Sequence, residues 1–278
     1  METKISMFVV LILVMYVCNE KCSEENAEER DCKVDEDIVL STGETLNTGE
    51  KSNPVDELVD DQEPDQTQSA LNYKIALHVE GEGLGDYFGR SVAYLGDVNK
   101  DGFDDVLVSA HNFARKIYLF SGPSGDLLFT KTGENWGDAF GYSIAKIGDF
   151  NGDSLPDFLV GAPRYDGVAG TDSGKIYIYS GKDYSLIFSL EGTSEKEFFG
   201  WSVSGAGDFN NDGFDDVIAG CGGNGKSFGS GLGKVRVISG SDNSILFTAT
   251  SEAVEDSFGW NVAGGGDLNG DGYADVIV

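Results

Sequence analysis

The sequence predicts an all-β protein, a β-propeller made of four-stranded antiparallel blades. Phe-Gly pairs begin four units, and an aspartate lies nine residues after each of these phenylalanines. Both features recur at spacings of 52, 59 and 59 residues, which identifies a structural repeat. Each unit holds short apolar runs and Gly-rich turns without helical periodicity, as expected for a propeller blade. The units begin near Phe88, Phe140, Phe199 and Phe258.

The chain of 278 residues begins with a segment that has the dimensions of a secretory signal peptide. Residues 5–17 are mostly apolar, and this run is shorter than the roughly 20 residues that a membrane-spanning helix needs. We therefore predict a signal peptide over residues 1–22, with an unassigned cleavage site, and no membrane insertion of the mature chain. A buried N-terminal helix or strand is the alternative.

Residues 23–70 are predicted to form an acidic, disordered linker. They hold 16 acidic and 3 basic residues and no aromatic residue, so they cannot bury enough apolar surface to fold. An acidic interaction tail is the alternative. Cys22 and Cys32 could pair with each other or with another chain, whereas Cys221 is predicted to be a small buried thiol.

Residues 71–278 form the predicted partial propeller, in which the strands of each unit follow the same order. A short alternating strand follows each Phe-Gly pair, at 91–94, 143–146, 202–205 and 261–264. A buried second strand is predicted at 106–108, 158–160, 217–219 and 276–278. Third strands are predicted at 116–120, 175–179 and 234–238, and fourth strands at 127–129, 186–188 and 245–247.

A nine-residue acidic loop joins the first and second strands of each unit and is predicted to bind Ca²⁺. Aspartate occupies loop positions 1, 5 and 9, asparagine occupies position 3, and position 7 supplies a backbone carbonyl. Five oxygen donors from one tight turn suit Ca²⁺, which takes about six to eight oxygens and accepts water among them. The candidate ligands of the four sites are Asp97, Asn99, Asp101, Phe103, Asp105, Asp149, Asn151, Asp153, Leu155, Asp157, Asp208, Asn210, Asp212, Phe214, Asp216, Asp267, Asn269, Asp271, Tyr273 and Asp275.

The second loop, residues 149–157, differs from the others. Position 6 is glycine in three loops but Ser154 here, and Pro156 follows at position 8. Because a positive φ costs serine more than glycine, we expect this site to be strained or weaker.

Two other interpretations of the loops compete with the calcium hypothesis. An EF-hand requires a glutamate at position 12, whereas these loops have apolar residues there (Val108, Val160, Ala219, Val278). Hairpin turns rich in Asp, Asn and Gly that bind no metal are the alternative. A cation is favoured because the loop carboxylates would otherwise repel one another, and Lys100 is the only basic residue within the four loops.

With the Phe-Gly pairs, the D-x-N-x-D-G-x-x-D loops and Gly161-Ala162-Pro163, this region resembles the FG-GAP repeats of the integrin α-subunit β-propeller. The resemblance covers about residues 71–278. It implies a propeller, of seven blades in that family, with calcium loops on one face. The Gly-Ala-Pro element is only partly kept, as Ser109-Ala110-His111 in the first unit and Gly220-Cys221-Gly222 in the third.

Three complete units and part of a fourth do not close a ring of about four to eight blades. Residues 73–79 look like the fourth strand of a preceding blade. We therefore expect a fragment of a larger ring, with the missing blades supplied by the rest of the chain. A truncated product without function is the alternative.

Loops alternate between the two ends of an antiparallel blade, which separates the calcium loops from a second loop face. That face is predicted to contain residues 80–87, 132–139, 164–173 and 222–232, with Trp136, Tyr165 and Phe228 among them. Aromatic residues on loops of a rigid scaffold suit a protein ligand, and ordinary variable surface is the alternative. Trp201 and Trp260 directly follow Phe-Gly and are predicted to pack between blades.

The charge of the chain excludes one class of function. A net charge of −29, from 19 basic and 48 acidic residues, argues against nucleic-acid binding. Two histidines without a nucleophile motif give no support for catalysis. We expect a secreted or cell-surface, calcium-binding module for cell adhesion or protein recognition, and no enzyme. The alternative is the non-catalytic propeller domain of a secreted hydrolase or lyase.

Overall fold

The computed structural model describes residues 79–83, 85–113, 115–222, 233–253 and 257–278. Every regular element in these residues is a β-strand, and they contain no helix of the length and apolarity needed to cross a membrane. The predicted signal peptide and acidic linker lie outside the described residues, as does all but Val79 of the strand expected at 73–79.

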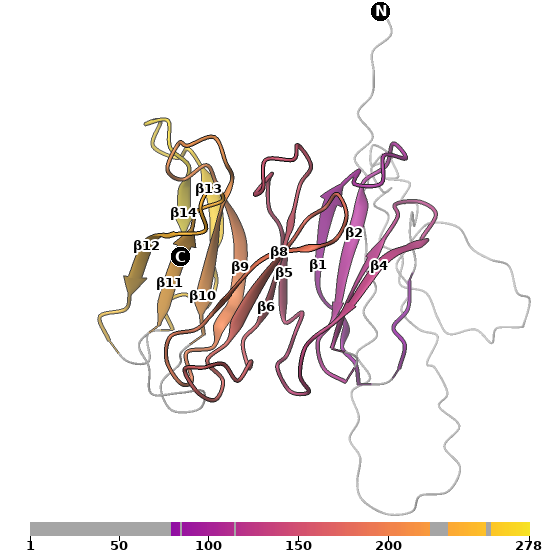
Figure 1. Ribbon diagram of the computed structural model, residues 1–278, viewed down its shortest axis with the longest axis horizontal. Coiled ribbons are helices and arrows are strands. Elements are labelled where there is room, and N and C mark those ends of the chain that lie inside the picture. Colours follow the sequence, from indigo (N-terminus) through magenta and orange to yellow (C-terminus); the bar gives the residue numbers. More distant parts are fainter. Residues whose placement is uncertain (1–78, 84, 114, 223–232, 254–256) are drawn as a thin grey trace, which may run out of the picture. The chain divides into compact units, whose positions relative to one another are not determined.

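The strands form three four-stranded antiparallel sheets and one two-stranded sheet, each with neighbours in chain order (Figure 1). Blade 1 contains β1 (Phe88–Gly96), β2 (Asp105–Ala110), β3 (Lys116–Phe120) and β4 (Leu127–Thr132). Blade 2 contains β5 (Ser143–Lys146), β6 (Phe158–Ala162), β7 (Lys175–Tyr179) and β8 (Leu186–Glu191). Blade 3 contains β9 (Phe199–Gly207), β10 (Asp216–Cys221), β11 (Lys234–Ile238) and β12 (Ile245–Thr250), and unit 4 contains β13 (Ala263–Gly266) and β14 (Asp275–Ile277). The predicted partial propeller is confirmed.

Most of the hydrophobic core lies between neighbouring blades: three buried clusters each join residues of adjacent units, and a fourth, from β2 and β3, lies within blade 1. The first strands adjoin in sequence order, β1 to β5, β5 to β9 and β9 to β13. One buried cluster joins Leu107 and Ile117 of blade 1 to Phe140 and Phe158 of blade 2. Because each sheet buries its apolar face against the next, neighbouring blades stabilise one another.

The third strands have the predicted bounds, whereas the fourth strands and the second strands of blades 1–3 are longer than predicted; β14 has the predicted length and begins one residue earlier. β2, β6 and β10 are buried along their whole length, and β4 and β12 are largely exposed. β1 and β9 begin at the Phe-Gly pair itself. Backbone hydrogen bonds continue beyond the apolar residues wherever the adjacent strand offers partners. A pattern of apolar residues therefore does not show where a strand ends.

The glycine of the Phe-Gly pair is the point of closest approach between blades. Gly200 has φ 85°, and a Cβ on it would lie 2.8 Å from the Lys175 carbonyl oxygen in blade 2. The Ser143 hydroxyl of blade 2 donates to the Gly200 carbonyl at 2.9 Å, and a Cβ on Gly161 would collide with that same carbonyl. Only glycine combines this backbone conformation with this approach. Gly259 packs against blade 3 in the same way, with Ser202 as the donor.

Replacing this glycine should therefore destabilise the protein more than a positive φ alone would. We expect Gly200→Ala to lower the free energy of unfolding by about 2–3 kcal/mol, measured by urea denaturation. Gly137→Ala isolates the backbone effect, because Gly137 has φ 99° and open space around its Cβ position, and should cost about 1–2 kcal/mol. Gly83→Ala, also in open space, should be nearly neutral. Equal losses for Gly200→Ala and Gly137→Ala would contradict the close-approach argument.

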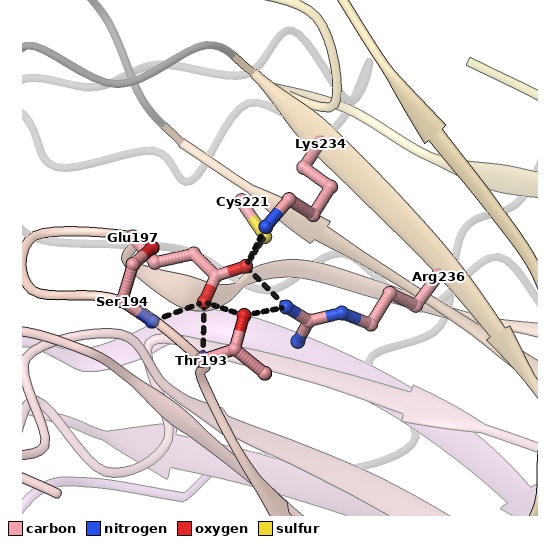
Figure 2. Close-up of polar contacts among 6 residues, drawn as sticks. All are labelled: Thr193, Ser194, Glu197, Cys221, Lys234 and Arg236. Carbon is pink, nitrogen blue, oxygen red and sulfur yellow. Dashed lines mark hydrogen bonds and ion pairs between the residues drawn. The ribbon is translucent and has the colours of Figure 1, made fainter. Parts of the chain in front are cut away.

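A buried ion-pair network ties the loop before β9 to blade 3 (Figure 2). One oxygen of Glu197 accepts hydrogen bonds from Lys234 Nζ at 2.8 Å, from Arg236 and from the Cys221 thiol at 3.6 Å. The other oxygen accepts the backbone N–H groups of Thr193 and Ser194. The predicted buried thiol of Cys221 is confirmed.

In blades 1 and 2, two carboxylates replace the single Glu197: one accepts the backbone N–H groups of the loop, and the other forms the ion pair. Asp86 and Asp138, two residues before the phenylalanine as Glu197 is, accept backbone N–H groups of their own loops. A separate glutamate pairs with the lysine that begins the third strand: Glu82 with Lys116 at 2.6 Å and Glu134 with Lys175 at 3.0 Å. In blade 3 Thr193 occupies the glutamate position, so Glu197 takes both roles. The sequence analysis missed this acidic position, although its spacing from Phe-Gly is constant.

Removing the charge of Glu197 should leave the buried Arg236 and the partly exposed Lys234 without a charged partner. We expect Glu197→Gln to cost about 3–5 kcal/mol in unfolding experiments, whereas Glu82→Gln at a more exposed pair should cost less than about 1 kcal/mol. A small loss for Glu197→Gln would contradict the assigned role.

The Glu197 network also predicts how the stability of the protein changes as the pH falls. Burial by itself would raise the pKa of Glu197, but Lys234 and Arg236 outweigh it and hold the pKa below its ordinary value of 4.5. A carboxyl with a lowered folded-state pKa stabilises the protein above its ordinary pKa and loses that contribution as the pH falls through the folded value. Wild type should therefore lose stability in acid more steeply than Glu197→Gln, as measured by unfolding between about pH 5 and pH 3.

Candidate functional site

Each acidic loop closes the hairpin between the first and second strands of its blade. Gly96 pairs with Asp105 in blade 1 and Gly207 pairs with Asp216 in blade 3, each beside a register shift. Loop position 9 is therefore the first residue of the second strand in blades 1 and 3 and unit 4, and it directly precedes that strand in blade 2. These loops connect β-strands and not helices, so the prediction against an EF-hand is confirmed.

The four loops share one set of internal hydrogen bonds. In blade 1 the Asp97 carboxylate accepts the N–H groups of Asp101 at 2.9 Å and Gly102 at 2.8 Å. Asn99 Oδ1 accepts the N–H of Asp101, and Asp101 Oδ1 accepts the N–H of Phe103. The equivalent bonds recur in the other three loops. The residue spacing therefore encodes a single loop conformation four times.

The position 9 aspartate anchors each loop to its blade. Asp105 is fully buried and accepts the N–H of Val98 at 2.9 Å and that of Gly122 at 3.3 Å. Gly122 belongs to the connection between the third and fourth strands, whose Ser121 also donates to Asp101 at 2.7 Å. The calcium-candidate loops and the connections from third to fourth strands thus lie at the same end of the blades, as predicted.

The loop carboxylates lack counter-charges. Burial raises the pKa of Asp105 and Asp216, and it raises the pKa of Asp157 to about 6, to which the nearby Asp153 carboxylate contributes. Among the described residues no lysine or arginine forms an ion pair with a loop aspartate. Within the described residues, the loops therefore concentrate negative charge that no ion pair offsets.

The donor set of each loop fits a hard cation. Aspartate, asparagine and backbone carbonyl groups supply oxygens only, the ligand type that Ca²⁺ takes. Their oxygens already accept backbone N–H groups and keep a further lone pair each. In the part of the chain that the structure describes, no three His, Cys, Asp or Glu side chains form a metal cluster by themselves. A bound cation would thus depend on the asparagine and the carbonyl as well.

The second loop carries the backbone strain that its sequence predicts. Ser154 has φ 69°, and the glycines at position 6 of the other loops have φ values of 92–93°. Position 4 is also left-handed in every loop, which the sequence analysis did not identify: Lys100, Gly152, Asn211 and Gly270. Asparagine and glycine at three of these positions are the signal that could have shown it.

Relieving the strain at Ser154 should stabilise the second loop. We expect Ser154→Gly to raise the free energy of unfolding by about 0.5–1 kcal/mol, because the left-handed conformation then costs less than the extra chain entropy of glycine. The reverse change in the third loop, Gly213→Ser, should lower it by a similar amount. Thermal denaturation of both variants measures the effect, and a loss in Ser154→Gly would show that the loop is not strained.

Adjacent loops are also joined across blades. Asp215, at position 8 of the third loop, accepts the N–H of Asp149 at 2.9 Å, and a Cβ on Gly148 would collide with its carboxylate. Asp215 is not among the predicted ligands. Its carboxylate instead accepts a backbone N–H group from the loop of the neighbouring blade. Loop-to-loop spacing is thus held by a hydrogen bond that no pattern within one repeat reveals.

The remaining loops gather at the opposite end of the blades. The N–H of Asn112, after β2, donates to the Asp86 carbonyl, and the N–H of Arg164, after β6, donates to the Asp138 carbonyl. Connections from second to third strands therefore contact those that precede the Phe-Gly pairs, as predicted. Trp136 is 72% exposed there, whereas Tyr165 is half-buried under Lys175. Phe228 lies outside the described residues.

A ladder of side chains follows the Phe-Gly glycines from blade to blade. We use the name aromatic ladder for Arg90, Tyr142, Trp201 and Trp260. The Arg90 guanidinium lies 4.9 Å from the Tyr142 ring centre, and Tyr142 and Trp260 each lie 4.7 Å from Trp201. Packing of the two tryptophans between blades is confirmed.

A pocket of about 370 Å³ opens beside the ladder. Its lining includes His111, Asn112, Trp136, Tyr142, Arg164 and Trp201. Burial lowers the pKa of His111 to about 4, assisted by the charges of Arg90 and Arg164, so this imidazole is neutral near pH 7. The Nδ1 atom of His111 is buried without a hydrogen-bond partner.

Sheets of four antiparallel strands packed through Phe-Gly contacts, each with an aspartate loop at one end, define a repeat protein of the β-propeller class. A family model described as the FG-GAP repeat matches residues 88–124, 140–179, 199–238 and 258–278. The chain is therefore an FG-GAP repeat protein similar to the integrin α-subunits, and the expected resemblance is confirmed.

Three curated relatives illustrate the similarity. Integrin alpha-5 of Xenopus laevis is 30% identical over 208 residues, which cover 69% of this chain and 20% of that protein. Integrin alpha-E of Mus musculus is 33% identical over 51% of this chain and 14% of its own length. Integrin alpha-6 of Homo sapiens is 33% identical over 52% of this chain and 13% of its own length. The chain thus spans no more than about a fifth of these relatives.

Proposed function

We propose that this protein is an extracellular, calcium-binding recognition module for adhesion or protein binding. The single observation that carries the proposal is the fourfold aspartate loop, in which oxygen donors converge in one conformation without a basic partner. The similarity to integrin α-subunits supports the recognition role. Secretion follows from the predicted signal peptide and from calcium binding at extracellular concentrations.

In this proposal the aspartates, the asparagine and the position 7 carbonyl of each loop hold Ca²⁺. The ion would supply the positive charge that the loop carboxylates lack. Asp105, Asp157 and Asp216 connect each loop to the connection between third and fourth strands through Gly122, Gly181 and Gly240. A cation that stabilises the loop would therefore also stabilise the blade. In this proposal the role of the metal is structural rather than catalytic.

Calcium should stabilise the folded chain. With dissociation constants of about 10⁻⁴–10⁻³ M, about 10 mM Ca²⁺ should add roughly 1.4–2.7 kcal/mol per occupied site and raise the melting temperature. Thermal melts with CaCl₂, MgCl₂ or chelator measure the effect. A melting temperature that responds to none of these would refute metal binding.

A matched pair of variants assigns the effect to the loops. Asp101→Asn removes a candidate ligand of blade 1, and Asp126→Asn removes the same charge from an exposed residue of that blade outside the loop. The calcium-dependent rise in melting temperature should shrink in Asp101→Asn and stay unchanged in Asp126→Asn. Equal rises in both variants would place the ion elsewhere.

The loop face opposite the aspartate loops is the proposed site for a protein ligand. Its loops sit on paired strands at the far end from the metal, so ligand contacts and metal contacts use different residues. We propose no catalytic role, because the sequence holds no nucleophile motif and the aspartates act as metal ligands in this proposal. Nucleic acid is an unsuitable partner for a chain of net charge −29.

A further inference from the structure

The pocket beside the aromatic ladder combines positive charge with aromatic walls, in a chain that is otherwise strongly acidic. Arg164 lines the pocket, and Arg90 lies over Tyr142, which forms part of its wall. Both arginines act electrostatically on His111. Neither makes an ion pair with a described residue, whereas the buried Arg236 is paired with Glu197.

Asp86 and Asp138, which precede the first two Phe-Gly pairs, form no ion pair with these arginines. Asp86 and Asp138 turn into their own loops and accept backbone N–H groups there. Burial raises the pKa of Asp172, and the charge of Arg164 opposes that rise without forming an ion pair; the Asp172 N–H donates to Asp166. An anion entering the pocket would thus meet the Arg164 guanidinium, which forms no ion pair within the described residues.

The rim of the pocket is apolar and exposed. Trp136 is 72% exposed, and its ring centre lies 6.2 Å from that of Phe113, which is 59% exposed. Val168, on the same set of loops, is fully exposed. Exposed aromatic and arginine side chains around a concave site are typical of the centre of a protein interface.

We propose that this pocket binds the carboxylate of a glutamate or aspartate that adjoins an apolar residue in a partner protein. Arg164 provides the planar donors that match a carboxylate, and Trp136, with Phe113 beside it, covers the neighbouring apolar side chain. The inference deepens the proposed recognition role and rests on it, by naming the chemistry of the ligand.

The three tryptophans of the chain make the pocket directly observable. Trp136 and Trp201 line the pocket, whereas Trp260 is not among the lining residues and its ring centre lies 4.7 Å from that of Trp201. We expect the capped dipeptide acetyl-Phe-Glu-amide to shift the indole N–H resonances of Trp136 and Trp201 more than that of Trp260. The dissociation constant should be on the order of a millimolar. Trp→Phe variants assign the three resonances.

Three comparisons test the carboxylate. Acetyl-Phe-Gln-amide should bind at least tenfold more weakly, and Arg164→Gln should weaken the binding of acetyl-Phe-Glu-amide at least tenfold. Lys182→Gln, which removes one positive charge near the aspartate loops, should leave it unchanged. Equal binding of the two dipeptides, or unchanged binding in Arg164→Gln, would overturn the proposal. Equal shifts with acetate alone would show a site for small anions instead of a docked peptide, and would also overturn it.

Calcium-dependent melting of the same samples separates this proposal from the metal proposal. Arg164→Gln should keep the full rise in melting temperature with Ca²⁺, because the pocket and the aspartate loops lie at opposite ends of the blades. If the dipeptide fails to bind while the calcium effect persists, only the pocket assignment is wrong. If the dipeptide binds and calcium has no effect, only the metal assignment is wrong.

Discussion

The rest of the structure depends on the close approach of neighbouring blades at the Phe-Gly glycine. At Gly200 the backbone is left-handed, touches the start of β7 and receives a hydrogen bond from Ser143. The phenylalanine beside it is buried between the sheets. Because most of the core lies between blades, this contact fixes how each sheet meets the next, and the loops at both ends take their spacing from it.

Carboxylates organise both ends of the blades by different means. At one end the aspartate loops collect oxygen acceptors with no described basic partner, an arrangement suited to a cation. At the other end Asp86, Asp138 and Glu197 cap the loops that lead into the Phe-Gly pairs, and Glu197 also neutralises Lys234 and Arg236. The acidity of the repeats therefore serves local structure at two sites in each blade.

Much of the fold and of the aspartate loops follows from the sequence, because both depend on short-range patterns. Strand order, the third strands, the hairpin loops and the left-handed Ser154 were all predictable from spacing and residue type. Strand ends were not, since backbone pairing extends past apolar runs. The acidic position before Phe-Gly was missed because a single carboxylate in a loop looks like ordinary surface until its hydrogen bonds are known.

The sequence by itself determined the repeat, the blade architecture and the identity of the candidate metal ligands, because these are encoded within about 60 residues at a time. Only the tertiary structure showed which residues of different repeats contact one another. The bond from Asp149 to Asp215, the aromatic ladder and the pocket that joins His111 to Arg164 and Trp201 all unite residues from different blades. Such contacts depend on how sheets pack, and packing brings together residues whose separation along the chain carries no periodic signal.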